Sequence, residues 1–453
     1  MKVFSFVAIF AFLASVECKK TYRVGVFADD RVQDVGRYVS MIEEAGIQNV
    51  DLVVLPLPAV SISDESIEDT DFSPQQYDKN IKTLSEAAKR ESIYVVAHLY
   101  EETYEGPART NVVLDRNGEV LTSYKKPVVM TTNSTSEIGS FTSNFGVIFG
   151  ILFEEDLAIH NIGRYKNVNN FIVLGRSSDE AFIGLEPSWA YISKSHFITN
   201  SHVFGNKYTE DKKTSKLIVA DLHKDGSEFS SVPVSHPSRL NAPLDLSQYT
   251  TKPLDVEASL QGYMDTVCHG TFCCGFYLKT SLMGSSKINV NYALSALDGL
   301  QTYGDHNLGV QHCAVFAYTG LYEHVLDFGF NQNHTSIKFD RIVVTHNKTN
   351  DIPLSLPIVV STDIISNKQF YFKNKNTKAT IEITDVNNIS VFGVFGRNYT
   401  RDFIEVKHSK SNSISWDLYD YINKENVSEF FDYLWIRIRI LLFIVSIYIL
   451  EMM

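Results

Sequence analysis

The spacing of apolar residues changes along this chain, and that change limits its fold more than any other feature. Tyr22 to Ala28 (YRVGVFA) is apolar at every second position, which predicts a strand. Val32 to Ala45 follows with helical spacing, and Gly46 stands where a C-cap is expected. Leu52 to Leu55 is a short apolar run typical of a buried strand. Strands and helices therefore alternate, as in an α/β unit.

The same alternation continues to about residue 126. Ser73 and Pro74 form an N-cap and first-turn pair, which opens a helix that runs to about Lys89. Further strands are predicted at Ile93 to Ala97, Asn111 to Asp115 and Val120 to Tyr124. Arg116 to Glu119 (RNGE) supplies a hairpin turn between the last two, because Asn-Gly tolerates positive φ angles. The sheet should therefore combine crossover connections with hairpins.

Only strand patterns remain in the later part of the chain. Ser336 to Val344, Lys368 to Lys373 and Thr380 to Thr384 alternate and are separated by Asn-rich polar turns. A length of 453 residues exceeds one ordinary core, so two folded units are expected. The second unit should be β-rich.

Both ends of the chain carry apolar runs. Lys2 followed by the run Val3 to Ala14 is typical of a secretory signal, and we expect cleavage after Cys18. At the other end, Ile440 to Leu450 is short for a membrane span, which needs about 20 residues. The tail fits a lipid-anchor signal with attachment near Asn426 and Ser428, a membrane segment, or a packed helix. We therefore expect an extracellular or cell-surface protein.

Cysteines and glycosylation sequons agree with that compartment. Removal of Cys18 leaves an even number of cysteines, which favours two disulfides with three alternative pairings: Cys268, Cys273, Cys274 and Cys313. Six N-x-S/T sequons are candidate glycosylation sites: Asn133, Asn333, Asn347, Asn388, Asn398 and Asn426.

Charge and motif content exclude several functional classes. The net charge of -12 and the absence of a Lys/Arg cluster argue against a nucleic-acid partner. No HExxH motif, no Cys/His zinc spacing and no phosphate-binding glycine loop occurs, so neither a metal nor a cofactor is expected. His98, His202 and His269 are interpreted as packing or hydrogen-bonding residues.

Several stretches together resemble the vanin and biotinidase branch of the carbon-nitrogen hydrolase (nitrilase) superfamily. They are Asp51 to Pro56 (DLVVLP), Leu84 to His98, Thr110 to Lys126 (TNVVLDRNGEVLTSYKK), Trp189-Ala190, Asn200-Ser201-His202 and Val267 to Tyr277 (VCHGTFCCGFY). The resemblance implies an α/β fold, a four-layer α-β-β-α sandwich, followed by a smaller β-rich domain. We expect a signal peptide at 1–18, the nitrilase-like domain at 19–305, the β-rich domain at 306–415 and the tail at 416–453.

Enzymes of this superfamily hydrolyse amides with a cysteine nucleophile, a glutamate base and a lysine that stabilises the oxyanion. The resemblance assigns the lysine to Lys126, with Lys125 as the alternative register. The glutamate should follow the proline of the strand-end motif, where this chain has Leu57. The retained lysine therefore lacks its base.

The cysteine is missing as well. The family pattern resembles FG-x-x-FG-x-x-x-CFD-x-LF, and Phe145 to Phe153 reads FGVIFGILF, so we expect the nucleophile segment to be deleted. The four later cysteines match structural cysteines of the branch. Glu154 and Glu155 are expected to begin a solvated segment; the alternative is that they neutralise Lys126.

Three hypotheses on function follow. The first is a non-catalytic, monomeric family member that works by binding. The second is an active amidohydrolase of pantetheinase or biotinidase type acting on a linear amide, with Ser140, Thr142 or Ser143 as a displaced nucleophile. The third is a carrier for a small apolar or amide-containing ligand, since Leu57 makes the old site less polar.

Overall fold

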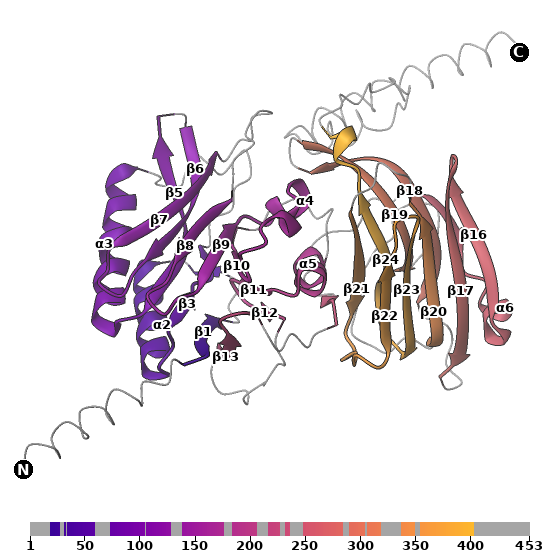
Figure 1. The fold of residues 1–453 in the computed structure, drawn as a ribbon, viewed down its shortest axis with the longest axis horizontal. Coiled ribbons are helices and arrows are strands. Elements are labelled where there is room, and N and C mark those ends of the chain that lie inside the picture. Colours follow the sequence, from indigo (N-terminus) through magenta and orange to yellow (C-terminus); the bar gives the residue numbers. More distant parts are fainter. Residues whose placement is uncertain are drawn as a thin grey trace, which may run out of the picture. The chain divides into compact units, whose positions relative to one another are not determined.

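Parallel strands with helical crossovers form the centre of the first sheet, as Figure 1 shows for this computed structural model. The structure describes residues 19–27, 31–32, 34–58, 73–104, 106–127, 138–175, 184–205, 216–226, 232–235, 248–283, 290–303, 306–318, 337–348 and 354–402. β1 (Thr21–Phe27), β3 (Leu52–Val54) and β5 (Tyr94–Thr103) are parallel, and α2 (Val35–Ile47) and α3 (Pro74–Glu91) lie between them in sequence. β6 (Gly106–Leu114) and β7 (Val120–Pro127) extend the sheet antiparallel on one side, and β13 (Leu217–His223) on the other.

The local signals predicted from the sequence form most of these elements. Ser73 caps α3 by accepting a hydrogen bond from the amide of Gln76 at 3.3 Å. Gly118 has a φ of +79°, as the expected hairpin turn requires. The predicted C-cap at Gly46 is wrong, because α2 continues to Ile47. A Cβ at Gly46 would lie 2.4 Å from a carboxylate oxygen of Glu91, so this glycine serves the contact between α2 and α3.

The second sheet repeats the same design. β9 (Ile148–Leu152), β10 (Asn170–Val173) and β11 (His196–Thr199) are parallel, with β8 (Gly139–Thr142) and β12 (Val203–Phe204) as antiparallel edges. The short helix α4 (Asp156–Ile159), the 3-10 helix η2 (Ile162–Arg164) and α5 (Leu185–Ser193) connect its strands. A further pair, β2 (Arg31–Val32) with β4 (Leu57–Pro58), is parallel and separate from both sheets.

Three buried apolar clusters confirm the predicted four layers. Met41 and Leu84 belong to the cluster between α2, α3 and the first sheet. Val24, from the first sheet, and Phe149, from the second, belong to the cluster between the two sheets. Trp189 of α5 packs with second-sheet residues in a third cluster. Helices therefore cover the outer face of each sheet.

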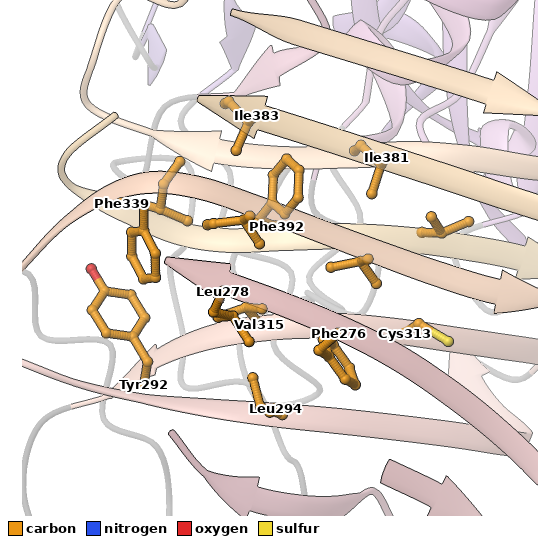
Figure 2. Packing of buried hydrophobic residues seen from close by; sticks show 14 of the residues in the cluster. Phe276, Leu278, Tyr292, Leu294, Cys313, Val315, Phe339, Ile381, Ile383 and Phe392 are labelled. Carbon is orange, nitrogen blue, oxygen red and sulfur yellow. The ribbon is translucent and has the colours of Figure 1, made fainter. Parts of the chain in front are cut away.

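The β-rich domain is a sandwich of two larger sheets. One sheet has the order β14 (Val234–Ser235), β21 (Leu354–Ser361), β24 (Ile389–Arg397), β19 (His306–Tyr318), β18 (Asn291–Tyr303) and β15 (Thr250–Pro253). The other has the order β16 (Tyr263–His269), β17 (Phe272–Leu282), β20 (Ile337–Asn347), β23 (Lys378–Val386) and β22 (Phe370–Asn374), with α6 (Val256–Gln261) before β16. Figure 2 shows how Phe276, Tyr292, Phe339 and Phe392 fill the space between them. A short 3-10 helix, η4 (Tyr399–Arg401), follows β24.

The structure corrects the expected boundary at residue 305. That boundary would cut the hairpin of β18 and β19, which are paired from Asn291 with Tyr318 to Tyr303 with His306. β14 to β17 also lie before residue 305, yet they pair only with sandwich strands. Strand pairing over a long sequence separation therefore assigns the chain from about residue 232 to the sandwich.

Arg397 joins the sandwich to the nitrilase-like domain. Its side chain is fully buried, and Nε donates to the carbonyl of Ala158 at the end of α4 at 2.7 Å. The guanidinium also donates to the carbonyl of Gly309 and, at 2.7 Å, to Asp402. Apolar residues of α4, α5, β19, β21 and β24 share one core cluster around this contact. The described residues of both domains belong to one compact unit.

Replacing Arg397 by methionine should destabilise the protein strongly. The change removes the buried cationic partner of Asp402 and the side-chain donor to the Ala158 carbonyl, which costs about 3 kcal/mol or more, although Asp402 and the Gly309 carbonyl keep backbone donors. Arg341→Met is the matched control, because Arg341 pairs with Glu382 on the surface and should contribute less than about 1 kcal/mol. Urea unfolding of both variants measures the difference in the free energy of unfolding. Equal losses in the two variants would contradict the role of Arg397 in joining the two domains.

The termini and half of the sequons lie outside the described residues. These are the expected signal at 1–18, the tail at 416–453, and Asn133, Asn333 and Asn426. In the part that the structure describes, no helix has the length and apolarity to cross a membrane. Asn347 is exposed at the end of β20, whereas Nδ2 of Asn388 donates to Asp363 at 3.0 Å. Asn398 is buried and caps η4.

The three described sequons should therefore differ in glycan occupancy. In protein secreted from eukaryotic cells, we expect a glycan on Asn347 and little or none on Asn398, whose side chain is only 6% exposed. Glycopeptide mass spectrometry measures both sites in one sample. Full occupancy of Asn398 would contradict the buried capping role of that side chain.

Candidate functional site

Strand alternation in β7 separates the two candidate lysines. Lys125 is directed to the side of the sheet where it pairs with Glu101, and 46% of its side chain is exposed. Lys126, one residue later, points to the opposite face, and its side chain is 3% exposed. Of the two registers, Lys126 is therefore the one that lies in a buried site.

Two carboxylates bind the Lys126 ammonium. Nζ donates a short hydrogen bond to Oδ1 of Asp156, and Oε1 of Glu155 lies 3.7 Å from Nζ. Both acids are buried at the start of α4, directly after the strand β9. Sequence analysis missed Asp156 and expected Glu155 to be solvated; the structure shows that the second expectation was wrong. Glu154 is half-buried.

Three further groups hold the Asp156 carboxylate in place. Its Oδ2 accepts from the amide of Phe153 at 2.8 Å and from the Tyr124 hydroxyl at 3.3 Å. Nε2 of His160 lies 3.5 Å from Oδ1. Burial alone would raise the pKa of Asp156, but the Lys126 charge and the bonds from His160 and Lys126 keep that pKa below its usual value. Asp156 is therefore a buried anion with several donors.

Arg109 completes the charge balance from the neighbouring strand β6. Its Nη2 donates to Oε1 of Glu155 at 2.7 Å, and its guanidinium lies 5.1 Å from the centre of the Phe153 ring. The Lys126 ammonium lies 5.4 Å from the same ring. Two basic and two acidic side chains are therefore enclosed with aromatic rings, an arrangement that neutralises charge inside the fold.

His98 packs beside this cluster. Its ring meets the Phe153 ring edge to face at 5.9 Å, and Nδ1 lies 2.7 Å from Oδ1 of Asn111. Burial lowers the pKa of His98 to about 4, helped by the charge of Arg109 and opposed by the bond to Asn111. At neutral pH the ring is uncharged, as its interpretation as a packing residue implies.

A second register of the family pattern needs no deletion of the nucleophile segment. Residues 145–159 are continuous through β9, the turn at Phe153 and α4. The fifteen-position family pattern fits this stretch without a gap, so that Glu154 stands where the cysteine is expected and Asp156 where the pattern has aspartate. The expected deletion follows when the pattern is read only as far as Phe153. In the register without a gap, the nucleophile is replaced and its segment is kept.

No described side chain offers an obvious substitute for the missing groups. Leu57 is half-buried in β4 and cannot accept a proton. Ser140 and Thr142 are exposed on β8, while the hydroxyl of Ser143 donates to the carbonyl of Val147 at 3.2 Å. Within the described residues, no group of three or more His, Cys, Asp or Glu side chains is arranged to hold a metal ion.

The four later cysteines form two disulfides, which resolves the three alternative pairings. Cys268 is bonded to Cys273 and Cys274 to Cys313. Nδ1 of His202 forms a hydrogen bond with the Ser201 hydroxyl at 2.7 Å. His269 lies in β16. The disulfides and His269 lie on strands of the sandwich, whereas the Lys126 cluster lies in the nitrilase-like domain.

Comparison with known proteins agrees with this arrangement. The carbon-nitrogen hydrolase family model matches residues 13–146, and the model of the vanin C-terminal domain matches residues 239–402. The layered first domain is that of a carbon-nitrogen hydrolase. With the sandwich that follows, the chain belongs to the vanin branch of the carbon-nitrogen hydrolase (nitrilase) superfamily.

Two relatives and one solved structure illustrate the likeness. Vanin-like protein 1 of Drosophila melanogaster is 22% identical over 81% of this chain and 82% of its own length. Vanin-like protein 2 of the same species is 22% identical over 86% of this chain and 91% of its own length. An amidase from Nesterenkonia sp. aligns with a TM-score of 0.36 and 18% identity, covering 46% of this chain and 92% of that chain.

Lys126→Met should destabilise the protein by about 3–5 kcal/mol at neutral pH, because it leaves the buried Asp156 carboxylate without its lysine counterion, whereas Glu155 keeps Arg109. The Asp156 carboxyl has a lowered pKa, so it contributes stability above about pH 4 and loses that contribution as the pH falls through the folded-state pKa. The loss should therefore be largest near pH 7 and shrink below pH 4. Urea unfolding across this pH range measures it.

Lys125→Met is the matched control for that measurement. It removes the neighbouring positive charge from the same strand, but the Lys125 side chain is 46% exposed and the buried Glu101 keeps the hydrogen bond from Thr110, so the change should cost only about 1 kcal/mol. A loss at Lys125 equal to that at Lys126, or a loss at Lys126 that does not depend on pH, would contradict the buried ion pair.

Proposed function

We propose that this chain is a non-catalytic member of its family, a secreted or surface-attached glycoprotein that keeps the fold and works by binding. The observation that carries this proposal is the state of Lys126. Its ammonium is already bonded to Asp156 and lies close to Glu155, deep in the interior. A cation neutralised in this way has little interaction left for the negative oxygen of a tetrahedral intermediate.

The roles of nucleophile and base have no suitable side chain when the family pattern is aligned with residues 145–159 without a gap. Glu154 occupies the cysteine position, and a carboxylate is a much weaker nucleophile towards an amide than a thiolate. Leu57 occupies the position of the base and cannot take or return a proton. Because the three groups act as a unit, loss of two of them and neutralisation of the third remove the activity together.

Secretion is supported by chemistry that belongs to an oxidising compartment. Two disulfides stabilise the sandwich, and such bonds are rare in the reducing cytosol. The apolar run that precedes residue 19 and the exposed sequon at Asn347 agree with it. We propose a small apolar or amide-containing molecule as the ligand, because Leu57 replaces a carboxylate with an apolar side chain.

The proposal predicts no amide hydrolysis. Purified protein incubated with pantetheine, biocytin and simple acyl amides should release no product above the buffer background, measured by mass spectrometry of the reaction. The double variant Leu57→Glu/Glu154→Cys is the informative comparison, because it restores both missing groups at the positions that the motif assigns.

Two outcomes would decide against the proposal or refine it. Turnover by the wild-type chain that Lys126→Ala abolishes would show an active amidohydrolase with displaced residues. Turnover only in the double variant would support both the register and the loss of catalysis. Native mass spectrometry of the secreted protein tests the binding role separately, since a bound ligand appears as a fixed added mass.

A further inference from the structure

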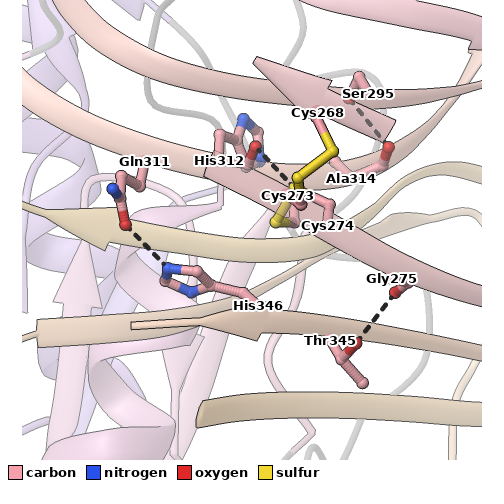
Figure 3. Close-up of a disulfide and its surroundings, with 11 residues drawn as sticks. Cys268, Cys273, Cys274, Gly275, Ser295, Gln311, His312, Ala314, Thr345 and His346 are labelled. Carbon is pink, nitrogen blue, oxygen red and sulfur yellow. Dashed lines mark hydrogen bonds between the residues drawn. A yellow bond between two sulfur atoms is a disulfide. The ribbon is translucent and has the colours of Figure 1, made fainter. Parts of the chain in front are cut away.

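The two disulfides lie on opposite faces of the same strand. Cys273 and Cys274 are neighbours in β17, so their side chains point to opposite sides of the sheet. Cys274 points into the sandwich and bonds Cys313 of β19 in the other sheet, and both cysteines are fully buried. Cys273 points outward and bonds Cys268 of β16. Figure 3 shows the outer bond running across the hairpin.

The outer disulfide is accessible and the inner one is not. Cys268 and Cys273 are both half-buried, on an edge hairpin of their sheet. Thiol–disulfide exchange requires a thiolate to approach a sulfur along the S–S axis, so access decides its rate. We therefore expect a small thiol to reach the outer sulfurs of the folded chain. The sulfurs of Cys274 and Cys313 become accessible only when the sandwich opens.

The hairpin does not depend on the outer bond. β16 and β17 are paired over seven residues, from Tyr263 with Leu278 to His269 with Phe272. Buried Val267 and Phe272 anchor the same end of the hairpin in the core. The outer disulfide spans five residues of sequence and the inner one 39, and a shorter loop removes less entropy from the unfolded chain. Opening the outer bond should therefore leave the domain folded.

We propose that Cys268–Cys273 is a reversible exchange site for low-molecular-weight thiols, while Cys274–Cys313 is a permanent structural bond. A thiolate attacks one outer sulfur, the S–S bond breaks, and the other cysteine leaves with the electron pair as a thiolate. A second thiolate attacks the sulfur of the bound thiol, which releases the first cysteine and a small-molecule disulfide. The net reaction converts one protein disulfide and two thiols into a protein dithiol and one small disulfide.

The direct pairing of Cys268 with Cys273 makes the reaction reversible. Their Cα atoms are 4.0 Å apart, and the hairpin register keeps the two residues opposite one another after reduction. Attack by one thiolate on an oxidised small-molecule disulfide forms a mixed disulfide, which the facing thiol can then displace. The site therefore responds to the ratio of thiol to disulfide around the protein.

The test is native-state reduction with graded glutathione, followed by N-ethylmaleimide and peptide mass spectrometry that resolves Cys273 from Cys274 by fragmentation. We expect Cys268 and Cys273 to be labelled together, at a rate at least about a hundredfold higher than that of Cys274 and Cys313. The reason is that the buried inner sulfurs can react only after the sandwich has opened. Circular dichroism recorded in parallel should stay unchanged. In a reduced sample without N-ethylmaleimide, oxidised glutathione should restore the outer bond.

Two results would overturn this proposal. Both pairs could open at one rate as the circular dichroism signal is lost, or the outer pair could stay unlabelled until urea unfolds the chain. The double variant Cys268→Ser/Cys273→Ser is the control, which should fold and show no native-state labelling. If that variant does not fold, the hairpin does depend on the outer bond, and this too contradicts the proposal.

Discussion

The ion pair of Lys126 with Asp156 is the interaction on which the rest of the site depends. A lysine ammonium inside a protein needs compensation, because transfer of a charge from water to the interior costs far more than most folds can supply. In this chain the compensation comes from the start of α4, where Asp156 and Glu155 face Lys126 across the space between the two sheets. These charged side chains hold one another in place.

That pair also connects the site to the second domain. Asp156 begins α4, and the last carbonyl groups of the same short helix accept hydrogen bonds from Trp189 and Arg397. One helix turn is therefore fixed at one end by the lysine of the first sheet and at the other by the arginine of the sandwich. Helices this short are not stable alone, so their position is set by such tertiary contacts.

Sequence patterns predicted the element types well wherever a local cause exists. The cap at Ser73, the turn at Gly118 and the alternation of β1 and β20 arise from neighbouring residues, and the structure contains them. Patterns failed where the cause is distant. The boundary at residue 305 was wrong because β14 and β17 pair with the later strands β21 and β20, and because β18 and β19 pair across it. Gly46 was misread because the side chain that crowds it belongs to α3. Asp156 was missed because nothing in its immediate sequence indicates burial, although the aspartate of the family pattern was a usable signal.

By itself, the sequence determined the family and the order of the α/β and β-rich parts, and it placed Lys126 and Leu57 in the motifs of that family, since these depend on residue identity and local periodicity. Only the tertiary structure decided which lysine is buried, which acids neutralise it and which cysteines pair. The physical reason is that burial, charge compensation and covalent pairing join residues that are remote in sequence. Lys126 and Asp156, 30 positions apart, meet only because two sheets pack face to face.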